Sequence, residues 1–67
     1  MAPTYRMPDD AGRGRRAALA ELDAALRAAR CAAGLAGMAT GEFAVRELLL
    51  TVVAQIDRAA AAGRRLA

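Results

Sequence analysis

Residues 48–56 read LLLTVVAQI and form the densest apolar run in the chain. Charged residues bound the run on both sides, at Arg46 and Glu47 before it and at Asp57 and Arg58 after it. A helix that crosses a bilayer needs about 20 mainly apolar residues, so this run is too short to span a membrane. Its apolar positions do not alternate as those of a half-buried strand do. The run therefore predicts a helix with one side packed against other protein.

The composition of the whole chain also favours helix. Alanine supplies 20 of the 67 residues, and the only aromatic residues are Tyr5 and Phe43. Any interior must then consist of closely packed Leu, Val, Ile and Ala, and an all-α fold is predicted. A single domain of this size buries only about 60% of its unfolded surface, so a lone copy would be marginally stable.

Prolines and glycines divide the chain into an arm and a hairpin. Residues 1–14 contain two prolines and two glycines and have no hydrophobic period, which predicts an irregular N-terminal arm. Asp9 or Asp10 would suit the N-cap of a helix with an earlier start. Residues 15–67 predict an antiparallel two-helix hairpin, with a helix over about 15–36, a turn over 37–40 and a helix over about 41–62.

The predicted turn rests on three residues. Gly37 suits the left-handed position just beyond a helix end, and Thr40 suits the N-cap of the next helix. Glu42 then falls in the first turn of the second helix, where a negative charge is favourable.

The apolar residues of the two helices predict a shared interior. In the second helix they span an arc of roughly 140°, and the leucines of the first helix form a narrower stripe. An antiparallel pair would bring Leu19 and Leu22 close to Ile56, Ala59 and Ala60. Because two helices share a single contact surface, we expect two hairpins to associate as a homodimeric four-helix bundle. The predicted oligomer interface contains Leu19, Leu22, Leu26, Val45, Leu48, Leu49, Val52, Val53 and Ile56.

Other apolar residues are candidates for binding another protein. Phe43 and Leu50 project to the side of the second helix opposite its main apolar arc. Tyr5 and Met7 lie in the N-terminal arm, which would dock on a neighbouring chain. The sequence therefore predicts a small non-enzymatic protein-protein interaction module: a homo-oligomerising adaptor, a regulator or an accessory subunit of a larger complex.

The alternative function is a nucleic-acid-binding transcriptional regulator. The net charge is +3, and Arg6, Arg13, Arg15 and Arg16 would give the arm a basic surface that neutralises phosphates. No aromatic residues are interleaved with these arginines to stack on bases.

The sequence offers no pattern for catalysis, for a metal or for a cofactor. It contains no histidine and a single cysteine, Cys31, which is expected to act as a small apolar residue. Two acid–arginine pairs, Asp23–Arg27 and Glu42–Arg46, have the i,i+4 spacing of solvated surface pairs on a helix. We therefore expect neither an enzyme nor a cofactor-binding protein.

The arginine content and the first ten residues predict the source and the location of the protein. The chain has ten arginines and no lysine, which together with its alanine content indicates a GC-rich genome and a bacterial protein. The opening residues, MAPTYRMPDD, lack the apolar stretch of a signal peptide. A cytoplasmic location is expected.

Overall fold

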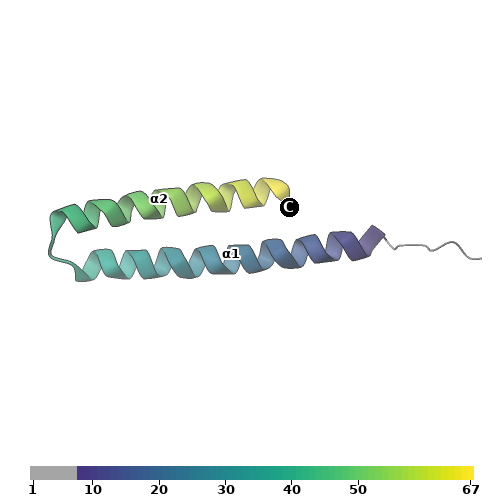
Figure 1. Ribbon diagram of the computed structural model, residues 1–67, viewed down its shortest axis with the longest axis horizontal. Coiled ribbons are helices and arrows are strands. Elements are labelled where there is room, and N and C mark those ends of the chain that lie inside the picture. Colours follow the sequence, from purple (N-terminus) through teal and green to yellow (C-terminus); the bar gives the residue numbers. More distant parts are fainter. Residues whose placement is uncertain (1–7) are drawn as a thin grey trace, which may run out of the picture.

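The fold is a hairpin of two antiparallel helices (Figure 1). The computed structural model describes the backbone of residues 8–67 and the side chains of residues 12–67. Within this part of the chain, α1 spans Pro8–Ala39 and α2 spans Phe43–Leu66. The two helices pack against each other, and the N-terminal end of α1 extends past the end of α2 (Figure 1). The predicted all-α hairpin is confirmed.

Helix α1 begins earlier than the sequence indicated. It starts at Pro8 rather than near residue 15, so residues 8–14 of the predicted arm belong to the helix. Proline suits the first helical position because its missing N–H has no intrahelical partner there. Asp9 and Asp10, either of which would have suited the N-cap of a helix with an earlier start, lie inside the helix. Gly12 and Gly14 are also helical, because a glycine weakens a helix by about 1 kcal/mol relative to alanine without ending it.

The turn also lies further along the chain than predicted. Helix α1 ends at Ala39 rather than near residue 36, and Gly37 lies inside it. The prediction of a left-handed Gly37 is wrong, since no glycine in the described residues has a positive φ. Helix α2 likewise runs from Phe43 to Leu66 instead of from about 41 to 62. The helices therefore pair in a shifted register.

Hydrogen bonds within the turn connect α1 to α2. The Thr40 N–H donates to the Ala36 carbonyl at 3.0 Å, and the Thr40 Oγ1 accepts a hydrogen bond from the Glu42 N–H at 3.1 Å. Glu42, with φ −92° and ψ 119°, is the N-cap of α2, and its side chain makes no capping hydrogen bond. The predicted roles of Thr40 as N-cap and of Glu42 in the first turn are thus both wrong by one to two positions.

Arg46 holds the two helix ends together. Its Nη2 donates to the Thr40 carbonyl at 2.8 Å, and its Nε donates to the Gly37 carbonyl at 3.4 Å. The last carbonyls of a helix lack intrahelical partners and favour a nearby cation, and α1 has no basic residue in its own last turn. Arg46 of α2 supplies that cation. It therefore binds backbone carbonyls at the turn instead of forming the predicted pair with Glu42.

The contact between the helices is a seam of small and branched residues. We define the seam by positions that face the other helix, spaced three and four apart on α2 and four or seven apart on α1, as in a heptad pattern. These small or apolar positions are buried or half-buried: Leu19, Leu26, Ala33 and Gly37 of α1, and Leu49, Val53, Ile56, Ala60 and Gly63 of α2.

Two close approaches define the register of the seam. Leu49 Cδ1 lies 3.9 Å from the position that a Cβ would take at Gly37, and Leu22 Cδ2 lies 4.0 Å from the equivalent position at Gly63. Leu22 is thus beside Gly63, about one turn beyond the predicted neighbours Ile56, Ala59 and Ala60. The difference follows from the later turn, because moving the turn shifts every pair across an antiparallel hairpin.

The interior of one copy is thin. Ala33, 8% exposed, is the only buried residue among residues 12–67. Helix α2 has no buried residue at all. Each helix therefore covers its partner's seam, while most of the remaining apolar surface stays in contact with solvent. Neither α1 nor α2, over the residues described, has an apolar stretch long enough to cross a membrane.

Candidate interaction surfaces

One side of the hairpin carries an exposed apolar face. On α1, Leu22 projects roughly 55° to one side of the seam, and on α2, Val45 and Val52 project roughly 45–65° from it. In an antiparallel pair these flanks lie on the same side of the molecule. The apolar face consists of Leu22, Ala29, Val45, Leu48, Val52 and Ala59, all of which are exposed.

The nine residues of the predicted oligomer interface occupy two places. Leu19, Leu26, Leu49, Val53 and Ile56 are seam residues, half-buried within one copy. Leu22, Val45, Leu48 and Val52 belong to the apolar face, where Leu48 reaches 67% exposure. A single copy therefore covers only part of the set that the sequence grouped together.

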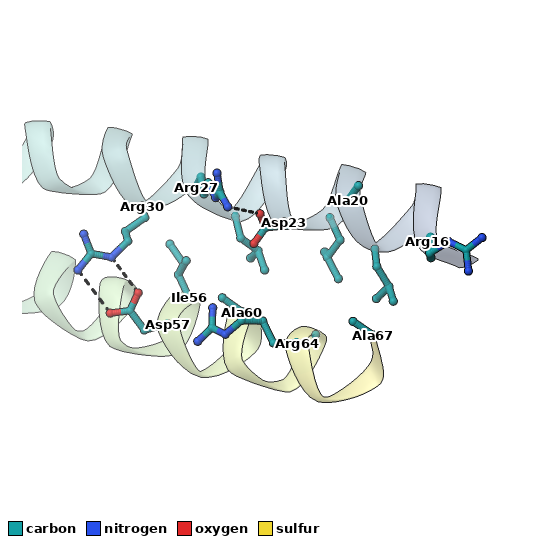
Figure 2. A pocket seen from close by; sticks show the side chains of 14 residues that line it. Arg16, Ala20, Asp23, Arg27, Arg30, Ile56, Asp57, Ala60, Arg64 and Ala67 are labelled. Carbon is teal, nitrogen blue, oxygen red and sulfur yellow. Dashed lines mark hydrogen bonds and ion pairs between the residues drawn. The ribbon is translucent and has the colours of Figure 1, made fainter. Parts of the chain in front are cut away.

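The opposite side of the hairpin is charged (Figure 2). Arg30 of α1 donates to Asp57 of α2 through Nε to Oδ1 at 2.8 Å and through Nη2 to Oδ2 at 3.5 Å. The hydrogen bond to Asp57 and the negative charge of its carboxylate raise the pKa of Arg30 above its ordinary value. The guanidinium's contribution to stability is therefore fully present below its ordinary pKa and is lost as the pH rises through the raised pKa. Asp23 and Arg27 form the predicted i,i+4 pair at 2.9 Å.

A groove of about 550 Å³ runs between the helices toward their open end. Figure 2 shows the ion pair of Arg30 with Asp57 at one end of this groove and Arg16 at the other. We call it the arginine-rimmed groove. Its floor is apolar and contains Leu19, Leu22, Leu26, Ile56 and Ala60, and its charged rim contains Arg16, Asp23, Arg27, Arg30, Asp57 and Arg64.

A second groove, of about 520 Å³, lies near the turn. Seam residues form its base, and Met38 and Leu50 contribute to its sides. Leu50, 58% exposed, is one of the predicted partner-binding residues, and Phe43 is exposed at the start of α2. Met38, which follows Leu35 by three positions and is likewise exposed, was not among the predicted partner-binding residues. Tyr5 and Met7, the other partner-binding candidates, lie outside the described residues.

The arginines of the proposed basic arm do not form one stripe. Arg6 lies outside the described residues, and Arg13, Arg15 and Arg16 are exposed residues of α1. Successive helical positions differ by about 100°, so Arg13 and Arg16 lie about 60° apart on one side of α1, whereas Arg15 projects about 100° or more from both. The structure instead brings Arg16 to the same groove as Arg64 of α2, a pairing that sequence spacing did not reveal.

The comparisons with other proteins leave the site to be interpreted from its geometry. No protein family model, no curated protein and no solved structure matches this chain. Among the residues described, no three His, Cys, Asp or Glu side chains are grouped so that they could hold a metal ion. Cys31 is exposed and forms no disulfide.

Proposed function

We propose that this chain is a non-enzymatic protein-protein interaction module that binds a second copy of itself through the apolar face. Two hairpins related by a two-fold axis would place their apolar faces together and form a four-helix bundle. The observation that carries the proposal is the exposure of Leu22, Val45, Leu48 and Val52. Helical spacing places these four on the side of the seam away from the ion pair of Arg30 with Asp57, although Leu22 also reaches the floor of the arginine-rimmed groove.

The energetic scale supports self-association. Full burial of a Leu or Val side chain contributes about 1.5–3 kcal/mol, and roughly half of that applies where part of the side chain is already covered. Two copies would contribute four such residues each, which gives a total of the same order as the roughly 4–15 kcal/mol that association costs. A dimer whose population depends on concentration is the expected result.

The end of the hairpin near the turn would bind a different protein. Phe43, Leu50 and Met38 are exposed there, on the side away from the apolar face. A dimer would therefore present two copies of this surface. We propose that the protein acts as an adaptor, a regulator or an accessory subunit in this way.

The test is the mass of the purified protein in solution, measured by size-exclusion chromatography with light scattering. The wild-type chain is expected to show twice the chain mass. Leu48→Asp should reduce the mass to that of one copy, because a charge at the centre of the apolar face would be buried on association. Leu50→Asp is the matched control: it changes another exposed leucine on the same helix, 58% exposed against 67% for Leu48, that projects about 160° away.

The outcome that contradicts the proposal is equally clear. A wild-type protein with the mass of one copy, folded in dilute solution, would disprove self-association. If Leu50→Asp dissociates the dimer and Leu48→Asp does not, the interface lies on the side of α2 that carries Leu50, and the proposed interface is wrong.

A further inference from the structure

The arginine-rimmed groove combines an apolar floor with an excess of positive charge. Four arginines and two aspartates line it. Both aspartates already form ion pairs, Asp23 with Arg27 and Asp57 with Arg30. Among residues 12–67, neither Arg16 nor Arg64 has an ion-pair partner. Two guanidinium groups therefore remain available on opposite helices beside the same apolar floor.

We propose that this groove docks an acidic amphipathic helix of a partner protein. The apolar side of such a helix would cover Leu19, Leu26 and Ile56, as in other helix-in-groove complexes. Carboxylates along its edges would meet Arg16 and Arg64, and charge-assisted hydrogen bonds from arginine to carboxylate are the stronger kind. The α1 residues from Arg16 to Arg30 extend about 21 Å, which matches a partner helix of about four turns.

The lining of the groove favours a peptide over nucleic acid. No aromatic residue lines the groove to stack on bases. Asp23 and Asp57 lie in its rim, where they would repel a phosphate backbone. An amphipathic helix needs no aromatic residue to stack on. Its few carboxylates can be limited to positions beside Arg16 and Arg64, whereas the charges of a phosphate backbone are continuous and would also meet Asp23 and Asp57.

This proposal concerns a different side of the hairpin from the proposed dimer interface. Apart from Leu22, the residues of the groove do not belong to the apolar face. Binding of a peptide in the groove and association of two copies can therefore be measured and can fail separately.

The experiment uses the full chain and a fluorescein-labelled helical peptide of about 15 residues, with Leu on one side and Glu at the flanking positions. A second peptide carries Lys in place of every Glu. Fluorescence anisotropy should show saturable binding of the acidic peptide and at least about tenfold weaker binding of the basic one. Duplex DNA of similar length is titrated in parallel.

Matched arginine variants locate the site. The double variant Arg16→Glu/Arg64→Glu should weaken binding of the acidic peptide by about tenfold or more. Arg15→Glu/Arg65→Glu is the control, because it makes the same change of charge at neighbouring positions that do not line the groove. Circular dichroism of both variants monitors their helix content, and light scattering monitors their mass.

Three results would overturn the inference. They are equal binding of the two peptides, equal loss of binding in the two double variants, and saturable binding of DNA that Arg16→Glu/Arg64→Glu alone abolishes while the acidic peptide does not bind. A chain that binds the acidic peptide while having the mass of one copy would overturn the proposed dimer and leave this inference standing.

Discussion

At the scale of single residues, Arg46 shows how a charged side chain can organise a turn. It lies in the first turn of α2 but donates to the Thr40 and Gly37 carbonyls at the end of α1. The i,i+4 spacing of Glu42 and Arg46 favoured a pair along one helix. It could not reveal this arrangement, because the carbonyls that Arg46 reaches depend on where α1 ends.

Replacing Arg46 with Ala should destabilise the hairpin by about 1 kcal/mol, since two hydrogen bonds from a charged donor are lost at the protein surface. Urea unfolding followed by circular dichroism measures the effect. Arg58→Ala is the control, because Arg58 lies on the same helix and forms no hydrogen bond or ion pair with the other residues described. Equal effects of the two substitutions would show that Arg46 does not hold the turn.

Gly37 tests where α1 ends. A Cβ at this position would be 3.9 Å from Leu49 Cδ1, an ordinary van der Waals distance. Gly37→Ala should therefore stabilise the protein by about 0.5–1 kcal/mol through the better helix propensity of alanine. Gly34→Ala, where a Cβ meets nothing within 4 Å, should give a similar gain in the same thermal melt. A left-handed Gly37 would instead make the substitution destabilising.

At the scale of helices, the sequence predicted the elements better than their ends. The spacing of apolar residues and the alanine content were enough for two helices and an antiparallel hairpin. The glycines were misleading: Gly12, Gly14 and Gly37 were each taken as a break, yet all three are helical. A helical glycine costs only about 1 kcal/mol relative to alanine, which is not enough to end a helix of good helix formers. At Gly37 the contact with Leu49 across the seam also favours a continued helix, and local sequence does not report that contact. Gly12 and Gly14 lie in the N-terminal end of α1, which extends past the end of α2 (Figure 1).

The ion pair between Arg30 and Asp57 joins the helices in the observed register, and a charge exchange tests it. Asp57→Arg should lower the melting temperature by placing two guanidinium groups together, and Arg30→Asp should do so with two carboxylates. The double exchange should recover most of the loss, because the pair is restored with reversed polarity. Salt at about 1 M should shrink these differences. Additive effects of the two exchanges would mean that the side chains do not interact.

At the scale of the whole molecule, the sequence could identify apolar residues but not divide them between two surfaces. Leu22 and Leu26 are one turn apart on α1, yet Leu26 faces the seam and Leu22 belongs to the apolar face. The division depends on the direction from which α2 approaches, which is a property of the pair of helices. The arginine-rimmed groove depends on the register as well, because Arg16 and Arg64 are far apart in the chain.

Thermal unfolding at several protein concentrations tests whether the hairpin relies on a second copy. If folding and dimerisation are linked, each tenfold increase in concentration should stabilise the dimer by about 1.4 kcal/mol, and the melting temperature should rise accordingly. Leu48→Asp should remove this dependence and lower the melting temperature at high concentration, whereas Leu50→Asp should keep it. The thin interior of one copy, with Ala33 as its only buried residue among 12–67, is the reason for this expectation. A melting temperature that stays constant over a hundredfold range of concentration, with a cooperative transition throughout, would show that one copy folds alone.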